Sequence, residues 1–125
     1  MKGQLAEIGY EQSKHDAGIK AITATDLPAI IVAVAELYQD LYDQSPYYIN
    51  CGNCEEFAHD VQDVFGRGEP FWQDEMSDCT ELEAVYWSHK FLQVDGRFYD
   101  SQSPEGVDNW RELPLFATQP VPTDT

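Results

Sequence analysis

The sequence predicts an α+β fold in which two main helices pack against one face of a small antiparallel sheet. Apolar residues recur at helical spacing in two stretches, one after Asp26 and one after Asn53. The dipeptide Asp95-Gly96 separates two runs rich in Val, Tyr, Trp and Phe, which is a strong signal for a two-residue β-hairpin. Because the chain has 125 residues and 42% of them are hydrophobic, we expect a single domain over 1–125 with its own core.

The first predicted helix follows a segment whose sequence pattern predicts little secondary structure. Residues 1–25 mix charges and small residues without a clear period, and only Gly18 to Thr23 suggests a short strand. Asp26 is suited to cap a helix, and Pro28 is suited to its first turn. From there a helix is predicted to about Tyr42, with one apolar stripe formed by Leu27, Ile30, Ile31, Val34, Leu37, Tyr38 and Leu41.

The second predicted helix begins at Cys54. Pro46 interrupts the preceding chain, and Asn53 is followed three residues later by Glu56, which is the spacing of a capping box. Gly66 is suited to the left-handed residue that ends a helix. Cys54 shares an apolar stripe with Phe57, Ala58, Val61, Val64 and Phe65. We therefore expect its thiol to face the rest of the fold from the first turn of the helix.

The hairpin is the predicted centre of the sheet. Residues 67–82 are mostly polar and are expected to form a long loop with room for a short strand. Ala84 to Val94 is predicted to be a strand, and Arg97 to Asp100 its partner. The remaining chain is expected to form a turn at Ser101 to Gly106, a segment from Val107 to Phe116 anchored by Trp110, Leu113 and Phe116, and a tail at 117–125.

The two-residue turn also sets the pairing of side chains across the hairpin. If Leu92 lies opposite Tyr99, then His89 and Asp100 are diagonal neighbours on the face that Phe91 shares. Such neighbours are roughly 7–8 Å apart at the backbone, so a hydrogen bond between imidazole and carboxylate is feasible. We expect the helix that begins at Cys54 to pack its apolar stripe on this face.

Together these residues have the composition of a catalytic triad. Cys54 at a helix start has its thiolate favoured by the helix dipole, His89 is a candidate general base, and Asp100 is a candidate to orient that base. The backbone N–H of Cys54, with a side-chain amide from Gln44, Asn50 or Asn53, could stabilise an oxyanion. We predict that Cys54, and neither Cys51 nor Cys79, is the reactive thiol.

Two runs, GNCEEFA at 52–58 and HKFLQVDGRFYDS at 89–101, resemble the papain-like cysteine hydrolases of the transglutaminase-like or NlpC/P60 type. Such proteins place Cys at a helix start, His on a strand, and Asp, Asn or His on the next strand. The resemblance covers about residues 50–106 and implies a minimal papain-like core. It also implies acyl transfer from a peptide, a protein or a small amide or ester to water or an amine, through a thioester on Cys54.

The spacing between Cys54 and His89 is shorter than in the larger members of that superfamily. This departure implies a minimal sheet and an open substrate cleft. The small acidic chain with its GNCEEFA segment also resembles small bacteriophage proteins.

Charge and cysteine content narrow the possible partners. With 7 Lys and Arg against 23 Asp and Glu, the net charge is -16, which argues against direct binding to a nucleic-acid backbone. The longest apolar run, Ala29 to Ala35, is too short to span a bilayer, so no membrane partner is expected. Three cysteines are an odd number and no signal peptide opens the chain, so we expect a cytoplasmic protein with at least one free thiol. The triad calls for no cofactor and no metal.

Other interpretations of the cysteines stay open. Cys54 could instead be a small buried hydrophobe, an interpretation that includes a triad without activity and that we favour less than the active triad. Cys51-Gly-Asn-Cys54 is a C-x-x-C at a helix start, which is typical of thiol redox sites, although no βαβ pattern flanks it. Zinc could be held by Cys51, Cys54, Cys79 and either His59 or His89, but a second closely spaced pair of ligands is missing.

The last alternative is a protein that only binds. The 23 carboxylates and 16 aromatic residues suit an acidic interaction or inhibitor protein that imitates nucleic acid and blocks a basic protein partner. His15 is expected to be exposed, and His59 to lie on the polar side of its helix. Neither of these histidines is expected at a site.

Overall fold

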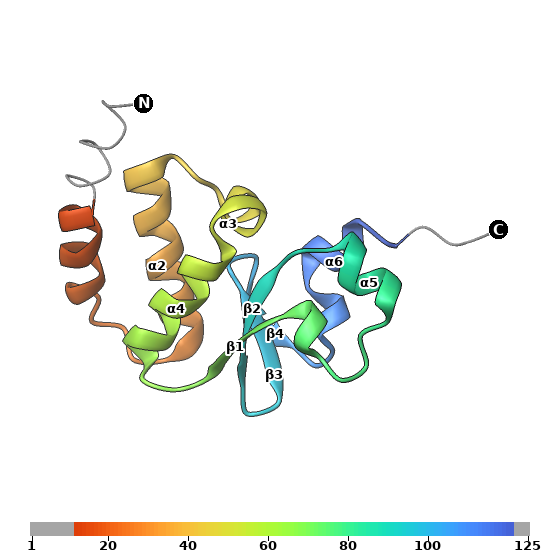
Figure 1. Cartoon of the computed structure of the whole chain (residues 1–125). Coiled ribbons are helices and arrows are strands. Elements are labelled where there is room, and N and C mark those ends of the chain that lie inside the picture. Colours follow the sequence, from red (N-terminus) through yellow and green to blue (C-terminus); the bar gives the residue numbers. More distant parts are fainter. Residues whose placement is uncertain (1–11, 122–125) are drawn as a thin grey trace.

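The computed structural model describes residues 12–121 and has the predicted α+β fold, with an antiparallel sheet between two groups of helices (Figure 1). Residues 12–20 are helical, so the strand expected at Gly18 to Thr23 is wrong, and residues 1–11 and 122–125 of the two expected end segments lie outside the described range. Among the described residues, none of the helices has both the length and the apolar composition that crossing a bilayer requires.

Helix α2 (Leu27–Tyr42) confirms the first predicted helix at both ends. The Asp26 carboxylate accepts a hydrogen bond from the backbone N–H of Ala29 at 2.9 Å, which satisfies one of the free donors of the first turn. Asp43 ends the helix in the left-handed conformation, with φ 54°.

Two helices follow where one was predicted. A short helix α3 (Pro46–Gly52) begins at the proline that was expected only to interrupt the chain. Helix α4 (Cys54–Phe65) begins at Cys54 and ends at Gly66, with φ 88°, as predicted. The capping box at its start does not form, since Asn53 makes no capping hydrogen bond; its side-chain amide donates to Gln44 Oε1 at 2.8 Å.

The sheet is a four-stranded meander of β1 (Glu69–Trp72), β2 (Lys90–Val94), β3 (Arg97–Asp100) and β4 (Ser103–Val107). The hairpin register is the predicted one, since Leu92 pairs with Tyr99 and Val94 with Arg97. Asp95 and Gly96 both have positive φ, of 52° and 80°, as a two-residue turn of this kind requires. Strand β4 replaces most of the turn that was expected at Ser101 to Gly106.

The strand predicted from Ala84 to Val94 is correct only from Lys90 onward. Its first residues belong to helix α5 (Glu81–Tyr86), which a capping box starts: Thr80 Oγ1 accepts from Glu83 N–H at 3.1 Å, and the Glu83 carboxylate accepts from Thr80 N–H at 2.9 Å. These two hydrogen bonds outweigh the β-propensity of Val85 and Tyr86. The last elements are short: η1 (Gln73–Glu75), η2 (Trp110–Glu112) and α6 (Pro114–Thr118).

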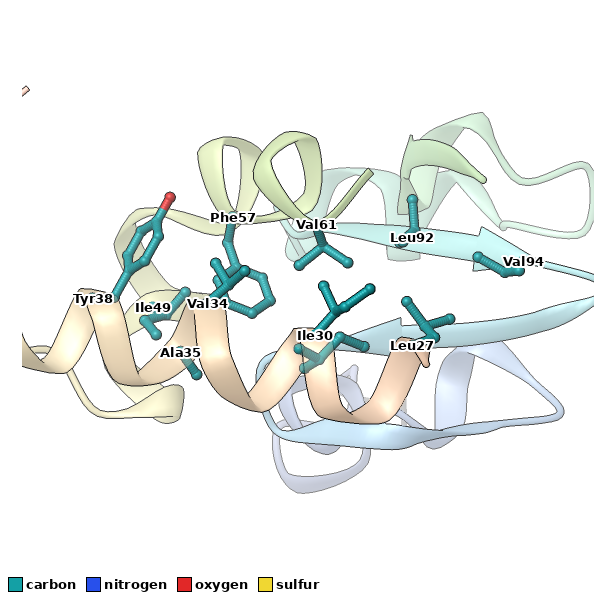
Figure 2. Close-up of a cluster of buried hydrophobic side chains, with 11 residues drawn as sticks. Leu27, Ile30, Val34, Ala35, Tyr38, Ile49, Phe57, Val61, Leu92 and Val94 are labelled. Carbon is teal, nitrogen blue, oxygen red and sulfur yellow. The ribbon is translucent and has the colours of Figure 1, made fainter. Parts of the chain in front are cut away.

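Buried side chains cover both faces of the sheet. On one face, α2 and α4 pack onto Leu92 and Val94 of β2 (Figure 2). On the other face, Phe91 and Phe98 pack with the aromatic and aliphatic residues Trp87, Trp110, Leu113, Leu115 and Phe116. The three anchors predicted after the hairpin, Trp110, Leu113 and Phe116, are all buried.

The face on which α4 packs was predicted wrongly. Its stripe residues Phe57 and Val61 contact the cluster that contains Leu92, not the face of Phe91. The reason is that the second face is already filled by the aromatic segment that follows β4. Cys54, at the first residue of α4, therefore meets the hairpin at one end of the sheet.

Candidate active site

Cys54 lies at the start of α4 with its side chain turned inward. The residue is only 9% exposed, in agreement with its predicted place on the apolar stripe. Its sulfur accepts a hydrogen bond from the backbone N–H of Lys90 at 3.3 Å. The start of the helix and the first residue of β2 thus hold the thiol between them.

His89 immediately precedes β2, and its imidazole is fully buried. Its Nε2 atom hydrogen-bonds to Asp100 Oδ2 at 2.9 Å, which confirms the pairing inferred from the hairpin register. The ring packs against Phe116 at 5.4 Å and Phe91 at 6.3 Å between centroids. Both the ring plane and one nitrogen are therefore constrained.

The second ring nitrogen of His89, Nδ1, has no hydrogen-bond partner among the described residues. Within residues 12–121, Nδ1 of His89 is the sole buried side-chain nitrogen or oxygen that lacks a hydrogen-bond partner. Asp100 occupies Nε2, so Nδ1 is the nitrogen left to interact with Cys54. Asp100 is itself held, because its Oδ1 accepts from the backbone N–H of Gln102 at 3.0 Å.

The electrostatics of Cys54 and His89 favour an ion pair. Burial acts to raise the pKa of the Cys54 thiol, but the nearby His89 imidazole and the hydrogen bond from the N–H of Lys90 outweigh it, and the pKa lies below its ordinary value. Burial acts to lower the pKa of His89, yet the hydrogen bond with Asp100 and the nearby Cys54 thiol raise it to about 9. Both shifts favour thiolate and imidazolium over the neutral pair.

Gln73 is a residue that the sequence analysis missed. Its side chain is buried; Oε1 accepts from the backbone N–H of His89 at 2.9 Å, and Nε2 donates to the carbonyl of Trp87. The backbone N–H of Gln73 also donates to the carbonyl of His89 at 3.2 Å. These bonds fix the backbone on both sides of the imidazole. No local pattern marks a glutamine in a polar loop for this role.

The amides proposed for an oxyanion site are mostly engaged elsewhere. Asn50 Nδ2 donates to Gln102 Oε1 at 2.8 Å, while its Oδ1 accepts from the Ser101 hydroxyl. Asn53 donates to Gln44, as described above. Asn50 is buried by these contacts and ties α3 to the chain that follows Asp100.

The other cysteines and histidines differ from Cys54 and His89. All three cysteines are free thiols, with Cys51 exposed and Cys79 partly buried. In the part of the chain that the structure describes, no group of three or more Cys, His, Asp or Glu side chains is arranged to hold a metal ion. The predicted exposure of His15 is wrong: it is buried and hydrogen-bonded to Asp60 and Tyr42, both at 2.7 Å.

Two hollows adjoin the Cys54–His89 pair. A cavity of about 10 Å³, the size of one water molecule, lies against Cys54, Asn50 and Asp100. A larger hollow of about 170 Å³ opens beside it, and we call it the α3–α5 groove. It is lined by Asn50 and Cys51 of α3, by residues 86–88, and by Leu115 and Gln119 at α6.

The groove lies near the pair, although neither Cys54 nor His89 lines it. Asn50 lines the cavity at Cys54 and also the groove, and Ser88 in the groove wall directly precedes His89. The groove is therefore a candidate place for the part of a ligand that flanks the thiol. Comparison of the chain with models of protein families, with curated proteins and with solved structures found no match.

Proposed function

We propose that the protein is a thiol-dependent hydrolase or acyltransferase that acts on an amide or ester bond through a thioester on Cys54. The observation that carries this proposal is the buried imidazole of His89, bound to Asp100 through Nε2 and without a partner at Nδ1. Because most buried side-chain polar atoms have a hydrogen-bond partner, an unpartnered Nδ1 near a thiol favours a role in proton transfer. The order of Cys54, His89 and Asp100 is that of a nucleophile, its base and the group that orients the base.

The reaction divides into two steps that use the same residues. In the first, the Cys54 sulfur forms a bond to the substrate carbonyl carbon, and the bond from that carbon to the amine or alcohol breaks. The thiol proton, held on His89, passes to the leaving group. In the second step, water or an amine gives a proton to His89 and attacks the thioester, and Cys54 departs and regains the proton. Asp100 holds the imidazole in one orientation throughout.

The minimal papain-like architecture inferred from the sequence is part of the same proposal. It is supported by a helix that begins at Cys54 and by His89 and Asp100 at neighbouring strands. A cytoplasmic location is also proposed, because three free thiols suit a reducing compartment.

An ester that releases a coloured product tests the proposal without knowledge of the natural substrate. We expect p-nitrophenyl acetate to acetylate Cys54, and the adduct to be found on that residue by peptide mass mapping and removed by hydroxylamine. Cys54→Ala should abolish this adduct. His89→Ala should slow its formation by about 100- to 10,000-fold, and Asp100→Asn by a smaller factor.

Cys79→Ala is the matched control, because that thiol is only partly buried and does not line the α3–α5 groove. It should acetylate at the wild-type rate. Acetylation spread equally over the three cysteines, or unaffected by His89→Ala, would contradict the proposal.

The acidic interaction protein is the competing hypothesis, and the net charge of -16 is the observation that favours it. It predicts binding to a basic protein that weakens steeply with added salt and is unchanged by Cys54→Ser. The acylation experiment separates the two hypotheses, because binding alone needs no reactive thiol.

A further inference from the structure

The exposed large hydrophobic side chains are unevenly distributed over the surface. Among residues 12–121 they number six, and one of them, Val32, lies on α2. The other five lie on the two short helices α3 and α5: Tyr47, Tyr48, Leu82, Val85 and Tyr86. Exposed apolar side chains gathered on two short helices commonly mark a surface that binds another molecule.

These two helices stand on opposite sides of the α3–α5 groove. Figure 1 shows α3 on one side of the end of the sheet and α5 and α6 on the other. The groove wall is apolar at Tyr86, Trp87 and Leu115, and Trp87 is fixed by a hydrogen bond from its indole N–H to the carbonyl of Gln119 at 2.7 Å. At 170 Å³ the groove is smaller than the roughly 300–1,000 Å³ of sites that enclose a whole small ligand. It is large enough for one side chain.

The charge of this protein indicates which kind of polypeptide would place a side chain in the groove. None of the residues that line the groove is an Asp, Glu, Lys, Arg or His. The molecule around it has a net charge of -16, so its field attracts cations and repels anions. The groove is therefore uncharged and mixed in character, with Tyr86, Trp87 and Leu115 as its apolar part. On an acidic molecule, that part suits an apolar side chain within a basic polypeptide.

We propose that the α3–α5 groove binds an extended, positively charged polypeptide and takes one aliphatic or aromatic side chain next to the carbonyl that Cys54 attacks. The inference rests on the proposed function, since it assigns the substrate class of that same thiol. The proposed substrate is therefore a polypeptide. A small ester or amide would leave the exposed surfaces of α3 and α5 uncovered.

Peptide chloromethyl ketones test the inference, because the thiolate displaces their chloride and leaves a stable thioether on Cys54. The probes are acetyl-Lys-Leu-, acetyl-Lys-Phe-, acetyl-Lys-Gly- and acetyl-Glu-Leu-chloromethyl ketone, with iodoacetamide as a probe too small to need the groove. We expect the Leu and Phe ketones to alkylate Cys54 about 10-fold faster or more than the Gly ketone. The Lys-Leu ketone should exceed the Glu-Leu ketone at low salt, and added salt should reduce that difference.

Substitutions in the groove test whether the preference for Leu over Gly arises there. Ser88→Trp fills the groove from an exposed position, and Tyr86→Ser removes an apolar wall. When each ketone rate is divided by the iodoacetamide rate of the same variant, both variants should have lost the preference for Leu over Gly. Val32→Ser is the matched control, because Val32 is 46% exposed and Tyr86 47%, and it should leave the preference intact.

The outcomes distinguish this inference from the proposed function. If iodoacetamide does not alkylate Cys54 in preference to the other thiols, the proposed function is overturned and the inference with it. If Cys54 is reactive but the Leu, Phe and Gly ketones react at equal rates, the inference alone is overturned. Equal rates for the Lys-Leu and Glu-Leu ketones at low salt would overturn its requirement for a basic polypeptide.

Discussion

Within the described residues, two buried histidines, His15 and His89, are each hydrogen-bonded to an aspartate. The number of ring nitrogens that have a partner distinguishes their roles. Both nitrogens of His15 are bonded, one to Asp60 and one to the Tyr42 hydroxyl. His89 is bonded to Asp100 through one nitrogen only. The two partners of His15 come from two different helices, so His15 connects helices, whereas Nδ1 of His89 has no partner within the described residues and can exchange a proton with a neighbour.

The ion pair of Cys54 and His89 predicts how the reactivity of the thiol depends on pH. Because the Cys54 pKa is lowered and the His89 pKa is raised to about 9, the iodoacetamide rate constant should rise in two steps. The first step forms the thiolate at a pH below the ordinary cysteine midpoint of about 8.5. The second, near pH 9, removes the imidazolium proton and leaves a more basic and more nucleophilic thiolate.

His89→Gln provides the comparison for this prediction. It removes the cation while it keeps a side chain able to hydrogen-bond to Asp100, and the burial of Cys54 then acts unopposed by the imidazolium. We expect a single step with its midpoint at or above the ordinary value, measured by mass spectrometry of Cys54 across the pH range. A wild-type profile with the same single step would show that no ion pair exists.

At the scale of elements, hydrogen bonds at helix and turn ends explain what could be predicted from the sequence. The boundaries of α2 and α4 and the hairpin register depend on local signals at Asp26, Gly66 and Asp95-Gly96. The proximity of Cys54, His89 and Asp100 could be predicted from the sequence, because each residue lies at such a boundary or in the hairpin whose register the turn sets. The predicted catalytic roles themselves await experiment.

The elements that were missed depend on competition between signals or on distant contacts. Residues 84–86 have strand propensity, but the Thr80–Glu83 capping box, supported by Arg111 bound to Glu83 at 2.7 Å, makes them helical. Gln73 acquires its role only when the chain brings η1 against the start of β2, from 16 residues away. Propensity and periodicity describe neighbours in sequence, so neither could identify it.

Gln73→Leu tests how far this connection between η1 and β2 positions His89. The change leaves the His89 N–H and the Trp87 carbonyl buried without their partners, so we expect unfolding in urea to show a loss of about 1–3 kcal/mol. The readout of positioning is the Cys54 alkylation profile, whose first midpoint should shift upward. Gln93→Leu, at a partly buried position of β2, is the matched control and should leave that midpoint unchanged. A stability loss with an unshifted midpoint would show a structural role alone.

At the scale of the whole molecule, the candidate site depends on how two buried clusters are joined. Cys54 belongs to the helix whose side chains pack onto Leu92, on one face of the sheet. His89 packs against Phe116, which belongs to the cluster on the other face. The distance between thiol and imidazole is therefore set by the sheet that both clusters share, and a loss of packing on either face would disturb it.

The net charge predicts that salt stabilises the whole molecule. Ion pairs within the described residues engage the three arginines, yet the full chain has 23 carboxylates against 7 Lys and Arg. Repulsion among the excess carboxylates therefore outweighs the surface pairs, and screening it favours the folded state. Between about 0.01 M and 1 M NaCl the Debye length falls from about 30 Å to 3 Å. We expect a gain of about 1 kcal/mol in urea unfolding, or roughly 4 °C in thermal melts.

Carboxylate variants show whether repulsion is the cause of this gain. Asp40, Asp63 and Asp74 are exposed, and replacing all three by Asn should reduce the dependence on salt and raise stability at low salt. Asp95→Asn is the matched control, because that carboxylate is bound to Arg67 at 2.9 Å and its removal leaves a cation without its partner. It should not raise stability at low salt. A fall in wild-type stability on adding NaCl would mean that ion pairs such as these, rather than the carboxylates in excess, dominate the electrostatics of the fold.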